Sequence, residues 1–156
     1  MTQAADAPPV SFADLPEAFD ALRQRGLRLS AARRLVLEAL FAAPAPASAE
    51  QIATRAGLDL ASTYRNLETL ERHGLARHVH FGHGAGLYVL VGRGEREYLF
   101  CERCREVRAL DPSELDPVRD CIREEFGYEA RFTHFAIVGT CPRCAATALS
   151  TATQAR

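Results

Sequence analysis

The sequence contains no lysine, so all 19 of its basic Lys/Arg positions are arginines. It has no apolar run near the roughly 20 residues that a membrane-spanning helix needs, so we expect no membrane association. Its first residues lack a basic stretch followed by an apolar one, so we expect no signal peptide and a cytoplasmic location. No Ser/His/Asp or Cys/His nucleophile arrangement is recognisable, which argues against an enzyme.

Four of the five cysteines form two pairs with C-x2-C spacing, Cys101/Cys104 and Cys141/Cys144. Two thiolates spaced this way can hold one metal ion from a tight turn, and the second pair completes a tetrahedral set of four sulfurs. We therefore expect a structural zinc with no open position for catalysis. Redox disulfides or unpaired core cysteines are the alternative, which a reducing compartment disfavours. Cys121 stands alone, either without a role or as a reactive thiol.

The net charge of −1 hides an asymmetry between the two halves of the chain. Residues 22–77 hold nine arginines against five acidic residues, a net charge of +4, whereas residues 93–144 hold nine against eleven, a net charge of −2. A basic first half indicates an anionic partner for that half, such as double-stranded DNA.

Four helices are predicted in the first half from apolar residues at helical spacing and from residues typical of helix ends. They are expected over residues 14–25, 30 to about 43, 48–56 and 59 to about 73. Ser30 and Asp59 are good N-caps, and Ser48 with Gln51 matches a capping box. Gly57 permits a tight turn, so the third and fourth helices are typical of a helix-turn-helix.

The fourth predicted helix has two different faces at about 100° per residue. One face groups Leu60, Thr63, Leu67 and Leu70, and the opposite face groups Ser62, Arg65, Thr69 and Arg72, with Tyr64 on the rim. A helix that packs with leucines and displays Arg, Ser and Thr suits the major groove of DNA. An ordinary amphipathic helix with a solvated face is the alternative.

Two strand-like runs follow, 75–81 and 87–91, with glycines between them, as in the wing of a winged helix. His78 and His80 alternate with apolar residues, so both side chains leave the same face of the first strand. We therefore expect a winged helix-turn-helix domain over residues 14–92, preceded by a flexible N-terminus over 1–13. Residues 93–96 read as a hinge.

The second half predicts a small α+β domain over residues 97–144, so the fold class of the chain is α+β. We expect strands at 97–100 and 106–110, a helix from Pro112 to Gly127, and a long strand over 128–138. The apolar residues of the helix, Leu115, Val118, Ile122 and Phe126, are expected to face inward. About 50 residues bury too little core, so this domain should be tied by zinc and completed by dimerisation. Residues 145–156 are expected to be a disordered tail.

In this order, five features resemble the ferric uptake regulator (Fur) family of metal-responsive transcriptional repressors. They are 26–33 (GLRLSAAR), 48–50 (SAE), 60–67 (LASTYRNL), 74–75 (GL) and the two cysteine pairs. The resemblance implies a homodimer that binds an inverted-repeat DNA operator and holds structural zinc. It also implies that Tyr64 and Arg65 meet bases, that Arg28 enters the minor groove, and that Arg33 and Ser48 lie near phosphates. We expect Ser62 to read bases with Tyr64 and Arg65, and Arg72 to lie on the same DNA-facing side.

The chain departs from the family where sensing metals usually bind. The histidine-rich run before the first cysteine pair is replaced by 94–98 (GEREY), which contains no histidine. A histidine before the third helix is replaced by Pro46, and a wing glutamate by Val89. The last family histidine falls on Thr133, with His134 one place later.

Two accounts of sensing therefore remain open. In the first, a second divalent metal such as zinc or iron is held by residues around the wing and hinge. The candidates are His78, His80, His83, Glu95, Glu97, Asp116 and His134. In the second, metal sensing through these positions is lost, and the protein responds to haem or oxidation or binds DNA constitutively.

Overall fold

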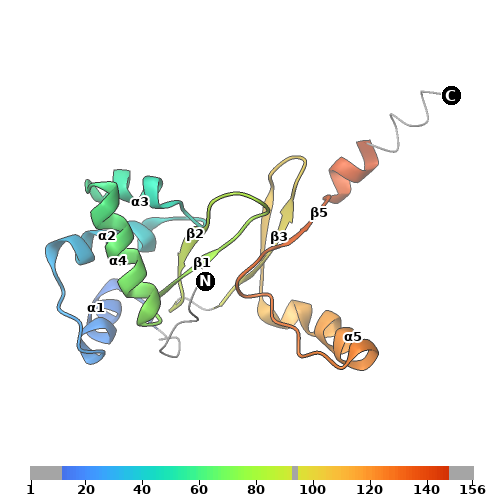
Figure 1. Cartoon of the computed structure of the whole chain (residues 1–156), viewed down its shortest axis with the longest axis horizontal. Helices are drawn as coiled ribbons and strands as arrows, with labels where there is room; N and C mark the ends of the chain where they lie inside the picture. Colours follow the sequence, from blue (N-terminus) through green and yellow to red (C-terminus); the bar gives the residue numbers. More distant parts are fainter. Residues whose placement is uncertain (1–11, 93–94, 148–156) are drawn as a thin grey trace. The chain divides into compact units, whose positions relative to one another are not determined.

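The computed structural model describes residues 12–92 and 95–147. The chain divides into two units, which are described separately (Figure 1). The first comprises the described residues up to Val79 together with Ala85–Glu95, and the second comprises His80–Gly84 and the described residues from Arg96 onward. Most of the expected flexible N-terminus and tail, and residues 93–94 of the expected hinge, lie outside the described residues.

Four helices and a two-stranded hairpin make up the first unit. The elements are α1 (Leu15–Gln24), α2 (Ala31–Ala42), α3 (Ala49–Ala56), α4 (Leu60–Arg72), β1 (Ala76–Val79) and β2 (Leu87–Leu90). The strands pair antiparallel, with His78 opposite Tyr88. The helices and the wing hairpin confirm the winged helix-turn-helix prediction.

Polar side chains at the predicted positions fix where these helices begin. Asp14, Ser30 and Asp59 each accept a hydrogen bond from a backbone N–H in the first turn of α1, α2 and α4. Ser48 and Gln51 form the predicted capping box at the start of α3. Each cap satisfies a donor that the helix itself leaves unpaired, so the sequence sets these boundaries locally.

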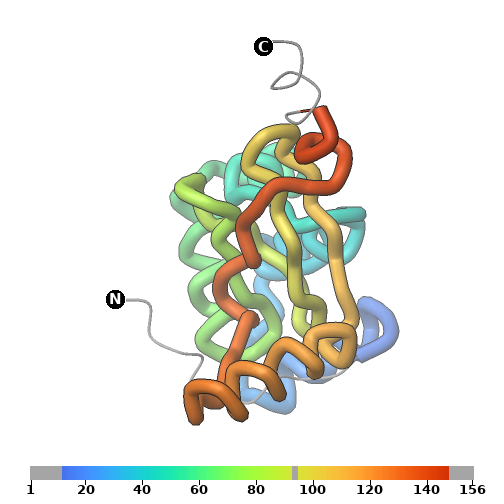
Figure 2. Tube along the Cα trace, turned by 90° about the vertical axis from the view of Figure 1, so that its right-hand side faces the viewer, coloured from blue at the N-terminus to red at the C-terminus, as the bar shows by residue number. Residues whose placement is uncertain are grey.

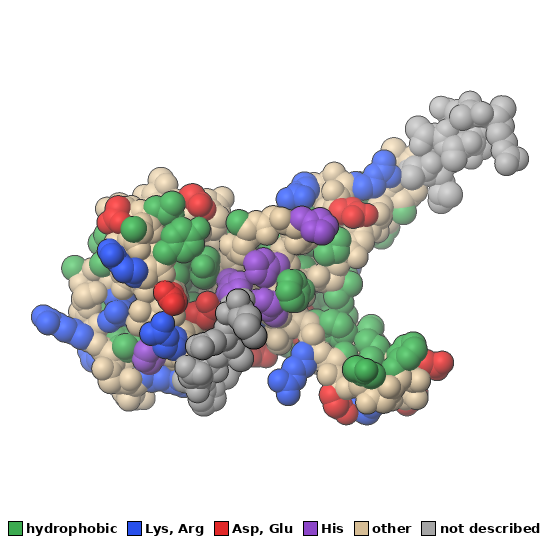
Figure 3. Space-filling view, in the orientation of Figure 1, with side chains coloured by type: hydrophobic (Ala, Val, Ile, Leu, Met, Phe, Trp, Pro, Cys, Tyr) green, Lys and Arg blue, Asp and Glu red, His purple; other side chains and the backbone are tan. Residues whose placement is uncertain are grey.

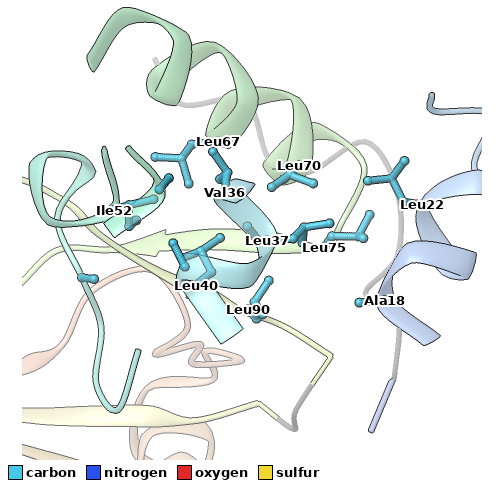
Figure 4. Close-up of a cluster of buried hydrophobic side chains, with 14 of the residues drawn as sticks. Ala18, Leu22, Val36, Leu37, Leu40, Ile52, Leu67, Leu70, Leu75 and Leu90 are labelled. Atoms are coloured by element: carbon cyan, nitrogen blue, oxygen red, sulfur yellow. The ribbon is translucent and has the colours of Figure 1, made fainter. Parts of the chain in front are cut away.

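The core of the first unit collects apolar side chains from all four helices and the hairpin. Figure 4 shows residues of α1, α2, α3, α4 and β2 pointing toward one another. The largest fully buried members are Leu22, Val36, Leu37, Ile52, Leu67, Leu70 and Leu75. Leu67 and Leu70 are buried and pack α4 against the core, as predicted. Leu60, predicted on the same face, is 41% exposed, and Asn66 is buried although it was not predicted there. Leu60 is the first residue of α4, where the packed face has not yet begun.

The expected flexible N-terminus ends earlier than predicted. Phe12 is 4% exposed, joins the core cluster, and donates its backbone N–H to the carbonyl of Gly92 at 2.9 Å. A Cβ at position 92 would lie 2.1 Å from the Phe12 ring, so only glycine permits this approach. Gly92, expected next to a hinge, is thus a packing position.

A three-stranded sheet and one helix form the second unit. Its elements are β3 (Glu97–Cys101), β4 (Val107–Leu110), a 3-10 turn η1 (Pro112–Leu115), α5 (Asp116–Phe126) and β5 (Ile137–Gly139). The strand order is β4-β3-β5, with β3 antiparallel to β4 and parallel to β5. Figure 2 faces this unit and shows the yellow hairpin beside the red C-terminal segment, with orange α5 at its lower end.

Three expectations for this unit were wrong. The long strand over 128–138 is reduced to β5, because the preceding residues run past the sheet without pairing except at Phe135. Residues 145–147 of the expected disordered tail continue a helical turn that starts at 142. Of the four apolar residues expected to face inward, Leu115 is buried, but Phe126 is 69% exposed and α5 itself contains no buried residue. In the part of the chain that the structure describes, no helix is long and apolar enough to cross a membrane.

Candidate nucleic-acid interface and metal centre

Helix α4 displays polar side chains on the side away from the core. Tyr64 is 43% exposed and Arg65 is exposed, whereas Ser62 is half-buried and donates its backbone N–H to the Asp59 cap at 2.7 Å. Arg72 is exposed and pairs with Glu68 at 3.2 Å. The exposed face can therefore present the phenol of Tyr64 and the guanidinium of Arg65 to a partner, while the buried Leu67 packs the opposite face against the core.

Three other predicted contact residues lie in the same unit. Arg28 is exposed, and its carbonyl accepts a hydrogen bond from Nη1 of Arg33. The Nε of Arg33 is buried and has no hydrogen-bond partner among the described residues. Ser48 Oγ accepts the N–H of Gln51 at 3.2 Å, and a backbone hydrogen bond together with the Ser48 hydroxyl lowers the pKa of Glu50. These groups are donors, as an anionic ligand requires.

Parallel pairing of β3 with β5 brings the two cysteine pairs together. Cys101 ends β3, and Cys141 follows β5 by two residues. The four sulfurs of Cys101, Cys104, Cys141 and Cys144 lie within 4.8 Å of one another, and the Cys104 and Cys141 sulfurs are 3.7 Å apart. Four sulfurs around one zinc at about 2.3 Å are about 3.8 Å apart, so the cluster has the size that this ion requires.

The electrostatics of the cluster also favour a cation. Backbone N–H groups of Cys104 and Cys141 lower the pKa of the Cys101 thiol to about 6, and the Cys141 N–H lies 3.3 Å from that sulfur. The neighbouring Cys141 side chain raises the pKa of Cys144 to about 12. One thiolate therefore forms readily, but the fourth cannot form beside the others unless a positive charge is present.

Two predicted acidic ligands bond to an arginine that the sequence reading did not single out. Glu97 is 2% exposed and pairs with Nη2 of Arg119, whose Nη1 donates to Asp116 at 2.9 Å and to the Pro112 carbonyl at 2.7 Å. The hydrogen bond with Glu97 raises the pKa of Arg119. The i,i+3 spacing of Asp116 and Arg119 could have signalled part of this arrangement, but the buried pair with Glu97 depends on how α5 packs.

The histidine candidates are distributed over both units. In the second unit the ring centroids of His80 and His134 are 5.2 Å apart. In the first unit Nδ1 of His78 bonds to a carboxylate oxygen of Glu71, and Tyr88 lies beside the ring. His83 is exposed in the turn of the hairpin, and Glu95 is also exposed. Among the second unit's candidates, only His80 and His134 fall in a potential metal cluster of the described residues.

Known proteins are similar to this chain over most of its length. Residues 35–80 match the IclR helix-turn-helix domain, which includes α3 and α4. The chain is 30% identical over 132 residues to the ferric uptake regulation protein of Neisseria meningitidis serogroup A, covering 80% of this chain and 91% of that protein. It is 24% identical over 136 residues to the peroxide operon regulator of Bacillus subtilis, covering 84% and 93%.

Solved structures share the fold over most of the chain. A Pseudomonas aeruginosa ferric uptake regulator with manganese aligns with a TM-score of 0.62 and 26% identity, covering 80% of this chain and 98% of that one. The Helicobacter pylori regulator Fur, described as having three functional metal-binding sites, aligns with a TM-score of 0.68 over 86% of this chain and 96% of that one. At 15% identity, the second comparison shows the fold alone.

Proposed function

The chain belongs to the ferric uptake regulator family, and from this premise we propose that it represses transcription as a homodimer bound to an inverted-repeat operator. As a member, it is a metal-responsive, DNA-binding transcriptional regulator. The proposal places it in the cytoplasm with the DNA it binds, and it includes no catalysis. Residues 14–92 would form the DNA-binding domain, 93–96 the hinge and 97–144 the dimerisation domain.

The exposed face of α4 is the observation that carries the proposal. Arg65 can donate two hydrogen bonds to a guanine edge, and the Tyr64 ring can lie against a thymine methyl. Ser62, one turn earlier on the same side, would read bases with them. Because Leu67 and Leu70 fix the opposite face in the core, the helix can enter a groove without unfolding.

Contacts to phosphates would supply most of the affinity. Arg28 and Arg72 are exposed, and the guanidinium of Arg33 and the hydroxyl of Ser48, both on half-buried residues, are donors without sequence preference. We place Arg28 in the minor groove and the other three residues against the backbone. Each neutralised phosphate releases counterions, so binding should weaken steeply as salt rises.

The open face of α5 supports the homodimer. Figure 3 shows apolar side chains exposed in the region of α5, where Val118 is 43% and Phe126 is 69% exposed. Tyr128 and Phe135, in the segment that follows, are 73% and 61% exposed. Large apolar side chains gathered in this way mark an association surface, and a second copy of the same unit presents the complementary apolar face.

We assign zinc to the four cysteines. The sulfur separation fits a tetrahedral zinc, and soft thiolates prefer this ion over manganese or magnesium. The ion would hold the ends of β3 and β5 together and would supply folding energy without chemistry. The further sensing candidates His78, His83 and Glu95 remain predictions.

The experiment is a mobility-shift titration with DNA from upstream of the protein's own gene. Arg65→Ala should weaken operator binding by about 1–3 kcal/mol and relax sequence preference, because a base contact is lost. Arg108→Ala is the matched control, since Arg108 is an exposed arginine of β4 in the other unit. Equal operator affinity for the Arg65→Ala variant and the unmodified protein would rule out α4 as the recognition helix.

A further inference from the structure

Two histidines of the second unit lie together at a place that the four-cysteine cluster does not use. His80 and His134 have ring centroids 5.2 Å apart, and their ring nitrogens lie within 4.8 Å of each other. Both side chains are half-buried, so ions in solution can reach the rings. No other histidine of this unit belongs to such a cluster among the described residues.

The backbone holds both histidines in place. The His80 N–H donates to the His134 carbonyl at 3.0 Å, and the Ala136 N–H donates to the His80 carbonyl at 3.0 Å. Phe135 stacks on the His80 ring with centroids 5.5 Å apart and meets the His134 ring edge-on at 4.6 Å. The two imidazoles are therefore positioned before any ligand arrives, which lowers the entropic cost of binding.

We propose that His80 and His134 each donate a ring nitrogen to one divalent transition-metal ion, forming a second metal site in this chain. The site deepens the proposed function, because it names where this metal-responsive regulator takes up its signal. Two nitrogens on one tetrahedral ion are about 3.4 Å apart, which a small rotation of the two rings achieves. Imidazole suits zinc, copper, iron or nickel, whereas magnesium prefers oxygen ligands.

The acidic candidates for a sensing site already have a cation. Glu97 and Asp116 both bond to Arg119, whose guanidinium occupies the space between the two carboxylates. A metal ion there would have to displace a charge-assisted pair from a buried position, which costs several kcal/mol. The His80–His134 pair is not part of this buried ion pair, so a metal ion there would leave the Glu97–Arg119 pair intact.

The number of ligands also suits a sensor. Two imidazoles leave positions for water, so the ion can enter and leave, whereas four thiolates enclose an ion completely. The pair would therefore respond to the concentration of free metal while the four-cysteine zinc stays bound.

The position of His80 gives metal binding a route to the DNA-binding unit. Segment His80–Gly84 belongs to the second unit, yet it is the turn of the hairpin whose strands β1 and β2 belong to the first. An ion on His80 and His134 holds this turn against the segment 134–136. Since Val79 and His80 are adjacent in the chain, that attachment reduces the conformational freedom of the wing and shifts the population toward one arrangement.

The test uses tag-free full-length protein with its four-cysteine zinc in place and Ni²⁺ as the probe. Equilibrium dialysis should show one Ni²⁺ bound per chain, unaffected by excess Mg²⁺. His80→Ala and His134→Ala should each weaken Ni²⁺ binding at least tenfold, and imidazole nitrogen resonances of both residues should shift on titration. His73→Ala is the control, because His73 is the histidine at the C-terminal end of α4 and is not a candidate ligand, and it should leave Ni²⁺ affinity unchanged.

Zinc content and the urea midpoint show whether each variant is folded. If an alanine variant loses its zinc, His80→Gln or His134→Gln replaces it and should lose Ni²⁺ binding equally. Unchanged Ni²⁺ uptake by the double variant, or no uptake by the unmodified protein, overturns the site. Operator binding is measured separately without Ni²⁺: a protein that binds its operator but takes up no Ni²⁺ refutes only this inference. A protein that takes up Ni²⁺ but binds no operator refutes only the proposed function.

Discussion

In the first unit, four helices and a hairpin enclose a cluster of fully buried side chains, whereas in the second unit the single helix α5 buries none of its residues. Leu37 and Leu70 of the first unit are 0% exposed, while Phe126 and Tyr128 of the second are about two-thirds or more exposed. We expect the buried apolar side chains of the first unit to be sufficient for its folding. The second needs additional links, which the proposed zinc at the four sulfurs and the proposed partner copy would supply.

The two units of this regulator therefore differ in what stabilises them. A self-sufficient DNA-binding unit keeps its recognition helix rigid whether or not a signal is present. A unit whose stability depends on metal and on association can respond to either.

Removing the four-sulfur site should have the largest effect. The variant Cys104→Ser/Cys141→Ser should unfold the second unit, because structural zinc contributes roughly 10–16 kcal/mol in small domains, while the first unit stays folded. Hydrogen exchange would show lost protection in β3, β4 and β5 and unchanged protection in α2 and α4. Cys121→Ser, at an exposed position of α5, is the control. Persistent protection of β3 in the metal-free variant would break the comparison.

Two alanine substitutions compare a buried apolar residue of the first unit with an exposed apolar residue of the second. Leu37→Ala should lower the free energy of unfolding of the first unit by about 2–5 kcal/mol, because it leaves a cavity in a closed core. Phe126→Ala should change the stability of a single chain by less than about 0.5 kcal/mol, because its ring is largely exposed. Urea unfolding at low protein concentration measures both.

The same Phe126→Ala variant should weaken dimerisation at least tenfold, or about 1.4 kcal/mol. Sedimentation equilibrium measures the dissociation constant, and Leu35→Ala is the control, since Leu35 is an exposed apolar residue of the first unit. Unchanged association for the Phe126→Ala variant would mean that α5 is not part of the dimer interface.

The smallest expected effect is at Ser48, where a cap and a DNA contact coincide. Ser48→Ala should destabilise the first unit by about 1 kcal/mol, because the N–H of Gln51 loses its acceptor. Ser48→Asp should keep the cap and the stability but lower DNA affinity, because its carboxylate faces the phosphates. If the Ser48→Asp variant binds operator DNA as tightly as the unmodified protein, Ser48 has only the capping role.

Local patterns in the sequence were enough to predict the helices of the first unit. Ser30, Ser48 and Asp59 each satisfy a backbone donor within three residues, so helix starts could be predicted without knowing the fold. The C-x2-C spacing likewise makes each cysteine pair a chelating turn. The two faces of α4 could be predicted because its packed and polar residues repeat at the helical period.

Long-range contacts decided what the sequence reading missed. The burial of Phe12 depends on Gly92, and the pairing of Glu97 with Arg119 joins β3 to α5 across 22 positions. The strand predicted over 128–138 is wrong before Ile137, because those residues, except Phe135, have no strand beside them to pair with. Apolar residues of α5 were expected inside, but a single chain provides nothing to cover them.

The sequence by itself determined the helix starts of the first unit, the two faces of α4 and the two cysteine pairs, because each depends on residues within a few positions of one another. Only the tertiary structure decided which titratable groups meet. In the folded chain Glu97 and Asp116 both form ion pairs with Arg119. His80 lies beside His134 because backbone hydrogen bonds link two segments that are far apart in the chain. Such pairings depend on the parallel arrangement of strands and the packing of a helix, which no local spacing encodes.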